Sequence, residues 1–460
     1  MKLTNKNIDN LEINDLIGTK LNCECGNVHV MSTEYVVVEE DAILKLPQII
    51  EKLGYKNILI ISDSNTNKVA GNKVNESLFK SKLNIKHFVF DTTQNDLVPN
   101  EEAIGKILVN AEKGLEVIIA IGTGTLNDLA KFVSYKLGIP SMVVATAPSM
   151  DGFASTGAAL IIGNLKITYV TDCPKVIIGD INILREAPMD MIVAGFGDIV
   201  GKYSAICDWK LSQLINSEYF CEVSCKMVQN SLKKCIENTE GIKNRDKTAI
   251  KNLMNALVLA GIAMSYVGNS RPASGSEHHM SHYFEMMFQF EDKEPVLHGA
   301  KVGISTVITM KLRELFAEST INFDESIIKA KNFNQNEWEK NVKGHYLSAA
   351  KGIIDINEKD QINSIEKRLE RIEFTKENLD KIQKIIKDVP SAEEVIEILK
   401  SVGAPYTPMQ VGIDEKTLVD GIKMAKEVRT RYTILNLLSD IGILDDFAYQ
   451  VKDYFKNEKM

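Results

Sequence analysis

The chain has 460 residues, of which 44% are hydrophobic and 25% are charged, a composition typical of a globular protein with two or three domains. The formal net charge of −8 disfavours a dedicated nucleic-acid binder, because phosphate contacts require an excess of Lys and Arg. We find no apolar run near the roughly 18 residues that a membrane span needs. The first residues, MKLTNKNIDNLEIND, lack the apolar core of a signal peptide. We therefore expect a cytoplasmic protein with no membrane span and no nucleic-acid partner.

Three potential metal ligands lie close together near the start of the chain: Cys23, Cys25 and His29. A structural zinc site needs four ligands, usually supplied by C-x₂₋₄-C pairs, and no second pair lies nearby in the sequence. The chain has seven Cys, an odd number that suits a reducing compartment. The sequence alone therefore argues against a metal role for this segment and leaves its function open.

The first 180 residues alternate between strand-like and helix-like patterns. Short apolar runs at residues 57–62, 116–122 and 141–147 are typical of parallel strands that are covered on both faces. Between the last two runs, residues 125–137 carry apolar side chains at helical spacing, namely Leu126, Leu129, Ala130 and Val133. The order strand–helix–strand predicts a parallel α/β sheet.

After about Asp180 the pattern becomes helical. Long segments at 189–214, 219–240 and 247–267 have helical periodicity, and the charged stretch 358–389 predicts a pair of surface helices. A new helix is predicted to begin after Pro390, because Ser391 and Glu394 form a capping-box pattern. We predict a Rossmann-like parallel-sheet domain at residues 1–182, followed by an all-helical domain at residues 183–460.

A glycine-rich turn follows the strand at 116–122. Gly122-Thr-Gly124 lies where a strand ends and a helix begins, a place where free N–H groups favour an anion such as a pyrophosphate. The usual G-x-G-x-x-G fingerprint fails because Asn127 replaces the third Gly, so a plain strand-to-helix turn stays an alternative. Asp63 and the polar turn 146–152 follow two other strands, and ligands bind at this carboxyl edge in open α/β sheets. The three turns together favour a nucleotide site.

Four of the seven His lie between residues 278 and 298. His278 and His282 are four residues apart and share one helix face, and His298 follows shortly after. A catalytic metal usually has three protein ligands and an open position, and Asp198, at a glycine-flanked predicted helix start, offers a third ligand. The alternative is that these histidines cap helices or lie on a solvated face.

Five segments occur in an order that resembles a known family: GTGTLNDLAK, TAPSMDGFAS, GFGD, SGSEHHMSH and LHGAKVG. Together they resemble the glycerol-1-phosphate dehydrogenases, which are relatives of iron-dependent alcohol dehydrogenases, glycerol dehydrogenases and dehydroquinate synthases. The late segment VRTRYTIL at residues 428–435 is similar to the bacterial branch. The resemblance runs from about Cys23 to Leu444, whereas residues 315–380 match nothing familiar.

The resemblance implies roles for individual residues. Those expected to line the pyrophosphate of NAD or to lie near it are Gly122, Thr123, Gly124, Thr125, Leu126, Thr146, Ser149 and Ser155. Asp63 would hold the adenosine ribose, and the metal would be held by Asp198, His278 and His298. The substrate would contact Asp151, Asp198 and His282, of which Asp151 and His282 are the expected catalytic residues. Thr123 stands where relatives often carry Gly, a small change that should not block the turn.

The activity implied is the reversible reduction of dihydroxyacetone phosphate to sn-glycerol-1-phosphate, a step of phospholipid biosynthesis. NAD(H) is expected over NADP(H), because the Asp63 carboxylate would repel a 2′-phosphate. One divalent metal, zinc, nickel or iron, would act as the Lewis acid, and His282 would relay a proton. We further expect a homo-oligomer.

Three other functions remain as alternatives. A dehydrogenase for glycerol or another polyol would share the metal and cofactor motifs. Lys202, Arg271 and Lys301 lie near the ligand motifs and favour a phosphorylated triose, although each could equally be a surface charge. A lyase like dehydroquinate synthase would need a denser set of basic groups, and a degenerate binding protein would have lost ligands that are present here.

Overall fold

The computed structural model describes residues 2–18, 20–79, 81–94, 96–163 and 165–457. The chain divides into two compact units. The sheet unit consists of Met1–Ile199 and Cys221–Ser270, and the helical unit consists of Val200–Phe220 and Arg271–Met460. The helices of Cys221–Ser270 therefore belong to the sheet unit, although they follow its last strand in the sequence.

A six-stranded parallel sheet forms the centre of the sheet unit, with strand order β4-β11-β8-β7-β5-β6. Its strands are β4 (Tyr35–Glu39), β5 (Asn57–Asp63), β6 (Asn84–Phe90), β7 (Val117–Gly122), β8 (Ser141–Ala145) and β11 (Val176–Asp180). The three predicted strands at 57–62, 116–122 and 141–147 are confirmed as β5, β7 and β8, three neighbours in the sheet. Strands β7, β8 and β11 are buried along their whole length. The predicted parallel α/β sheet is therefore confirmed.

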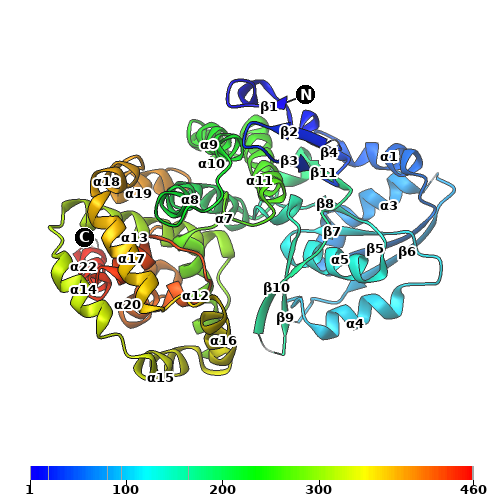
Figure 1. The fold of residues 1–460 in the computed structure, drawn as a ribbon. Helices are drawn as coiled ribbons and strands as arrows, with labels where there is room; N and C mark the ends of the chain where they lie inside the picture. The colour runs from blue at the N-terminus through cyan, green and yellow to red at the C-terminus, as the bar shows by residue number, and fades with distance from the viewer. Residues whose placement is uncertain (1, 19, 80, 95, 164, 458–460) are drawn as a thin grey trace. The chain divides into compact units, whose positions relative to one another are not determined.

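Helices cover both faces of this sheet (Figure 1). One face packs against α1 (Leu46–Leu53) and α3 (Asn72–Leu78), and Ile60 and Ile119 belong to this core. The opposite face packs against α5 (Gly124–Leu137), the helix predicted at 125–137. Cover on both faces explains why these strands are continuous apolar runs and do not alternate.

The remaining elements of the sheet unit are shorter strands and further helices. The strands are β1 (Lys2–Leu3), β2 (Lys20–Cys23), β3 (Val28–Val30), β9 (Gly157–Ile162) and β10 (Leu165–Val170). The helices are α2 (Ser64–Thr66), α4 (Glu101–Asn110), α6 (Ile181–Leu184), α7 (Met189–Val200), α9 (Glu222–Ile236), α10 (Thr239–Lys243) and α11 (Lys247–Val267). Helix α7 ends at the boundary with the helical unit, and the chain continues from there into α8.

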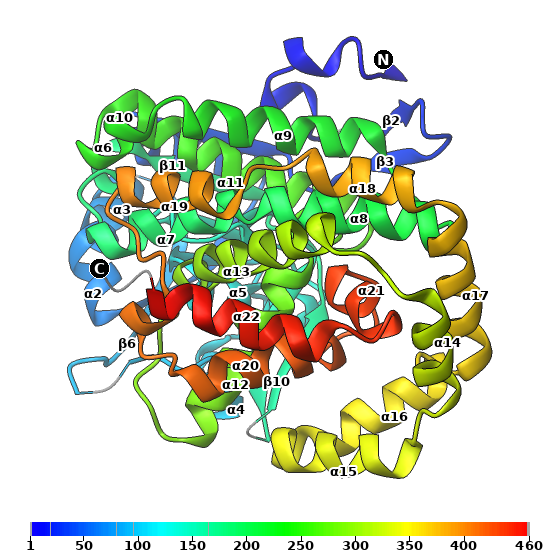
Figure 2. The ribbon, with the colours of Figure 1, turned by 90° about the vertical axis from the view of Figure 1, so that its left-hand side faces the viewer.

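Within the part of the chain that the structure describes, no strand follows β11, as the sequence predicted. The helices of the helical unit are α8 (Lys202–Asn216), α12 (Ser276–Phe290), α13 (His298–Glu318), α14 (Phe323–Lys331), α15 (Gln335–Tyr346), α16 (Ala350–Asp360), α17 (Ile365–Glu377), α18 (Leu379–Lys387), α19 (Ala392–Ser401), α20 (Glu415–Met424), α21 (Ile434–Asp440) and α22 (Leu444–Asn457). Figure 2 shows α13 in the middle of this unit, packed against α12, α19 and α22. The pair predicted at 358–389 corresponds to α17 and α18, and Ser391 and Glu394 form the predicted capping box of α19.

Two expectations from the sequence are wrong. Asp198 was expected at a helix start, but it lies in the last turn of α7, and the single segment predicted at 189–214 is two helices that meet at Gly201. We also expected no segment that is long and apolar enough to cross a membrane, yet α11 meets that criterion by length and composition. Since 67% of its most apolar window is buried inside the protein, α11 is a core helix, and its apolar length is explained by packing.

Candidate active site

Three turns meet at the carboxyl edge of the parallel sheet. Because β5, β7 and β8 are parallel neighbours, the residues at or just after their ends, Asp63, Gly122 and Thr146, lie along one edge. The Thr146 N–H donates to the carbonyl of Gly122 at 3.3 Å, which joins two of the turns directly. The structure thus brings together the three turns from which the sequence predicted a nucleotide site.

The two glycines of the turn between β7 and α5 have different surroundings. A Cβ on Gly122 would lie 2.5 Å from the end of the Leu126 side chain, so a side chain here would force Leu126 to shift. A Cβ on Gly124 would lie 3.7 Å from Met150, an ordinary contact distance. Gly124 opens α5, where the first N–H groups have no partner within the helix. Its lack of a side chain is therefore explained better by a ligand than by protein packing.

The residue that breaks the glycine fingerprint has a structural role that the sequence did not reveal. Asn127 is buried on α5, and its amide donates to the carbonyl of Gly152 at 3.4 Å. Lys131, one helical turn further, is also buried and donates to the same carbonyl at 3.3 Å. Ser155 donates to it from the other side at 3.1 Å. These bonds fix the polar turn after β8 against the helix that follows the glycine turn.

Asp63 lies at the end of β5, where the ribose contact was expected. Its Oδ1 accepts the N–H of Thr66 at 2.8 Å, so the carboxylate caps the short helix α2. The capping bond fixes the side chain at the sheet edge. The contact with a ribose stays a prediction.

The carboxylate of Asp198 is held inside the sheet unit. Its Oδ2 accepts the N–H of Asp151 at 2.9 Å, and both residues are buried. A Cβ on Gly195, one turn earlier on α7, would lie 1.8 Å from the carbonyl oxygen of Pro148, so no side chain fits there. The glycine of the GFGD motif therefore lets α7 approach the turn after β8 closely, and two predicted site residues, Asp151 and Asp198, become neighbours.

Three of the four clustered histidines converge in the helical unit. The ring centroid of His298, at the start of α13, lies 5.1 Å from that of His278 and 5.5 Å from that of His282, both on α12. His279 is fully buried, and burial, with the charges of nearby arginines, lowers its pKa well below the usual range. His278 and His279 are therefore not on a solvated helix face, whereas His282 and His298 are partly exposed.

A buried carboxylate fixes the orientation of His278. Glu277 Oε1 lies 2.7 Å from His278 Nδ1 and also accepts the N–H of Gly275 at 2.8 Å. Burial would raise the pKa of Glu277, but the hydrogen bond and the charge of His278 hold that pKa below the usual range. An ionised carboxylate can only accept, so Nδ1 carries a proton; in the neutral form of the ring, Nε2 then keeps the lone pair that a metal ligand needs.

Asp208 on α8 connects the two helices that carry the histidines. Its Oδ2 accepts the N–H and the hydroxyl of Ser276, the first residue of α12, at 2.7 and 2.6 Å. Its Oδ1 accepts a hydrogen bond from Arg313 of α13 at 2.7 Å and from the N–H of Ile434 at 2.9 Å. This fully buried carboxylate was not singled out in the sequence, because its partners are distant along the chain.

Three arginines gather near the start of α21: Arg271 is buried, whereas Arg429 and Arg431 are half-buried. Arg429 Nη2 lies 3.5 Å from His282 Nε2. Burial, followed by the charges of Arg429 and Arg271, lowers the pKa of Arg431 to about 9. Glu218 accepts two hydrogen bonds from Arg271, at 2.7 and 2.5 Å. Such a gathering of cations is what a dianionic ligand would stabilise.

Arg271 and Arg431 line a cavity of about 740 Å³ in the helical unit, together with Tyr432, but Arg429 and the three histidines are not part of its lining. This volume is in the range of small-molecule sites. The three cations that favoured a phosphorylated substrate are all buried, with exposed fractions of 0% for Lys202 and 2% for both Arg271 and Lys301. The alternative that they are surface charges is therefore wrong.

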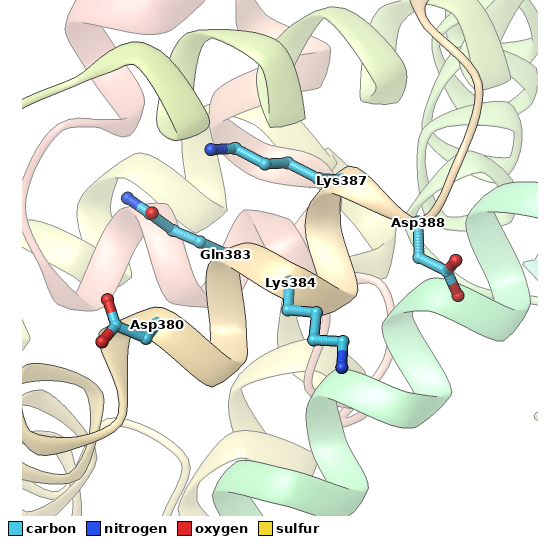
Figure 3. Close-up of a pocket in the computed structure, with 5 residues that line it drawn as sticks. All are labelled: Asp380, Gln383, Lys384, Lys387 and Asp388. Atoms are coloured by element: carbon cyan, nitrogen blue, oxygen red, sulfur yellow. The ribbon is translucent and has the colours of Figure 1, made fainter.

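A second hollow, of about 470 Å³, lies beside α18. Figure 3 shows its five lining side chains, Asp380, Gln383, Lys384, Lys387 and Asp388, which all come from α18 and the residue after it. Lys384 and Asp388 point away from Gln383 and Lys387, so the side chains do not converge on one ligand. None of the predicted site residues lines this hollow.

Comparisons with known proteins agree with this geometry. The profile of a family described as iron-containing alcohol dehydrogenase matches residues 37–188. The chain is 30% identical over 439 residues to a glycerol-1-phosphate dehydrogenase [NAD(P)+] of Geobacillus thermodenitrificans, covering 95% of this chain and 100% of that protein. A relative of the same name from Halalkalibacterium halodurans is 30% identical over 420 residues, covering 91% and 95%. The structure of an iron-containing alcohol dehydrogenase from Thermococcus thioreducens has the same fold, with a TM-score of 0.60, 15% identity, and coverage of 92% and 99%.

Proposed function

The chain belongs to the glycerol-1-phosphate dehydrogenase family, and we propose that it interconverts dihydroxyacetone phosphate and sn-glycerol-1-phosphate with a nicotinamide cofactor. The observation that carries the choice of a phosphorylated substrate is the neighbouring pair Arg429 and Arg431, of which Arg429 lies beside His282, whereas Glu218 already balances the charge of Arg271. These two half-buried cations repel each other, and a phosphate dianion would relieve this repulsion through charge-assisted hydrogen bonds. A site for an uncharged polyol has no use for such a pair.

We propose that residues 1–182 bind the nicotinamide dinucleotide and that residues 183–460 supply most of the metal and substrate contacts. The pyrophosphate would bind at the start of α5, against the backbone of Gly122, Gly124 and Leu126, with Thr123 and Thr125 between them. The residues proposed to line the rest of the cofactor are Thr146, Ser149 and Ser155. Asp63 would bind the ribose and favour NAD(H) over NADP(H).

The residues proposed to hold a divalent metal are Asp198, His278 and His298. Their donor set, two imidazoles and one carboxylate, suits zinc, iron and nickel. The orientation of His278 by Glu277 supports the proposal, because ligating histidines usually donate their second N–H to a carboxylate or carbonyl. A metal bound there would supply a Lewis acid for the oxygen on the reacting carbon.

Glu285 offers another carboxylate to the same histidines. One ligand atom each of His282, Glu285 and His298 lie within 4.8 Å of one another. We nevertheless propose a different role for Glu285, because it lies 3.4 Å from His282 Nδ1 and 3.8 Å from the ammonium of Lys301. It would orient His282, which would exchange a proton with the substrate oxygen, while Asp151 contacts a substrate hydroxyl. Metal analysis of Asp198→Asn and Glu285→Gln separates the two assignments, since only the former should lose the metal.

The function is tested by comparing NADH oxidation with dihydroxyacetone phosphate and with dihydroxyacetone. A site built around Arg429 and Arg431 should prefer the phosphate ester by about 10³-fold or more in kcat/KM. Arg431→Gln should remove most of this preference while leaving the low rate with dihydroxyacetone unchanged. Comparable rates with the two substrates would mean that the enzyme acts on unphosphorylated polyols and would overturn the proposed substrate.

Two further properties are part of the proposal. In the reverse direction the enzyme should oxidise the sn-1 and not the sn-3 enantiomer of glycerol phosphate, and activity on the sn-3 form alone would contradict it. We also propose that the protein is cytoplasmic and that it forms a homo-oligomer. Light scattering on the purified protein would test the oligomeric state.

A further inference from the structure

The segment from Cys23 to His29, which the proposed active site does not use, lies beside a fourth potential metal ligand in the folded protein. Cys23 ends β2, Cys25 lies in the turn that follows, and His29 is in the middle of β3. Cys221, at the start of α9, joins them although it lies 192 residues beyond His29. One ligand atom from each of the four residues lies within 4.8 Å of all the others.

The distances within this cluster match those of a tetrahedral zinc site. Ligands at about 2.3 Å for sulfur and about 2.0–2.1 Å for nitrogen around one centre lie about 3.8 Å apart for two sulfurs and about 3.6 Å apart for a sulfur and a nitrogen. The Sγ atoms of Cys23 and Cys221 are 3.8 Å apart. His29 Nε2 lies 3.6 Å from the Sγ of Cys25 and 3.5 Å from that of Cys221. Three separations therefore have the lengths that one shared ion would impose.

The surroundings of the cluster are those of a metal centre. His29 Nδ1 donates to the carbonyl of Tyr266 at 2.9 Å, which directs Nε2 toward the sulfurs, and its ring is stacked on that of Tyr266 at 4.7 Å. The N–H of Ser224 donates to the sulfur of Cys221 at 3.4 Å, and a helix start favours a thiolate. His29, Cys23 and Cys221 are buried.

Neither a disulfide nor a set of free thiols accounts for the cluster as well as a metal does. A disulfide between Cys23 and Cys221 would need the two sulfurs at about 2.05 Å, far below the distance observed. Free thiols carry protons, and hydrogen bonds between them do not require four ligand atoms that all lie within 4.8 Å of one another. A bound metal ion displaces such protons and stabilises the thiolates.

We propose that Cys23, Cys25, His29 and Cys221 bind one structural Zn²⁺, separate from the metal of the active site. Three thiolates and one imidazole fill the tetrahedral positions, so no position is left for a substrate. The sheet formed by β1, β2 and β3 has strands of only two, four and three residues, and such a small sheet has little stability of its own. The ion would fasten this sheet to α9, and His29 would fasten it to α11.

The first test uses the wild-type chain, purified under reducing conditions after growth with Co²⁺ in place of zinc. Tetrahedral Co²⁺ bound to thiolates gives an intense sulfur-to-metal charge-transfer band, whereas the active-site ligands contain no sulfur. The expected result is this band at one equivalent per chain. A protein that binds metal without any thiolate band, or that has a Cys23–Cys221 disulfide by mass spectrometry, would overturn the proposal.

Variants then locate the ion. Cys221→Ser should lose one equivalent of zinc per chain, and Cys235→Ser, a buried cysteine on the same helix outside the cluster, should keep it. His298→Ala should keep the thiolate band while losing the other metal. Should Cys221→Ser not fold, release of zinc from wild-type protein by a mercurial reagent decides the matter, because the same chain must release one zinc as its thiols react. Zinc content that is unchanged in both Cys221→Ser and Cys25→Ser would refute the site.

Discussion

Asp208 offers a direct test of how the helical unit positions its histidines. Asp208→Asn keeps the size of the side chain but removes its charge, and Arg313 is left buried without its counter-ion. Burial favours the neutral form of Arg313, yet the charge of Asp208 holds the pKa of Arg313 above its usual value, which shows how strongly the pair is coupled. Removing one partner of a buried pair costs about 3–5 kcal/mol. We expect the free energy of unfolding of the helical unit to fall by about this amount.

The chain provides a selective probe for this measurement. Both of its tryptophans, Trp209 and Trp338, lie in the helical unit, so tryptophan fluorescence during urea unfolding reports on that unit. Asp208→Asn should shift the transition to lower urea concentration and also weaken metal binding, since Asp208 holds the start of α12.

Two controls make the result specific. Asp414→Asn changes an exposed carboxylate that caps α20 in the same unit, and it should cost about 1 kcal/mol or less. The double variant Asp208→Asn/Arg313→Met should recover part of the lost stability, because the unpaired buried charge is gone. The reasoning would be refuted if the free energy of unfolding of Asp208→Asn were within about 0.5 kcal/mol of that of the wild type. It would also be refuted if the double variant were less stable than Asp208→Asn, as expected for two independent destabilising changes.

Three further predictions concern the active site. Gly124→Val should fold, because a Cβ has room there, but NADH titrations should show greatly weakened binding with the metal retained; unchanged affinity would make the turn purely structural. Glu277→Gln should weaken metal binding by about 10–100-fold in competition with a chelating dye, and equal affinity would exclude the orienting role. Glycerol phosphate at about 100 times its Kd should stabilise the wild type by about 2.7 kcal/mol, which is measured as a rise in melting temperature. Most of this rise should be lost in Arg431→Gln. An equal rise in both proteins would show that Arg431 does not bind the phosphate.

Elements specified by local patterns were predicted well from the sequence. The segment predicted at 247–267 is α11, and the run at 57–62 is β5 with one residue added. In both, the burial of each side chain follows from its place within a single helix or strand. Neither β4 nor β11 was singled out as a strand from the sequence. These two strands pair in parallel although their residues are about 140 positions apart, as Tyr35 opposite Val176 illustrates. Only the assembled sheet brings them together.

The residues of the candidate site also fall into those that local spacing reveals and those whose role depends on contacts between distant parts of the chain. The Gly122 turn and the pair His278 and His282 are visible because their spacing alone puts them at a helix start or on one helix face. Asn127 could be seen only as a departure from a motif, and its bond to Gly152 depends on how the turn after β8 folds back. The role of Asp208 depends on three helices that converge on one carboxylate, and spacing in the sequence carries no trace of this.

The Cys23 cluster shows that sequence spacing can reveal part of a metal site but cannot exclude one when a ligand is missing from the local motif. A short motif such as Cys23, Cys25 and His29 contributes ligands whose geometry the local hairpin largely determines, so the motif is visible. The ligand that completes it comes from wherever the fold brings a suitable side chain, here from Cys221 at a helix start. An incomplete local motif is therefore weak evidence against a metal, whereas agreement of three interatomic distances with one coordination geometry is strong evidence for it. The same reasoning applies to Asp198, a proposed ligand of the active-site metal that lies 80 positions before His278. Substitution of the distant residue is therefore the sharpest test of each proposed metal site.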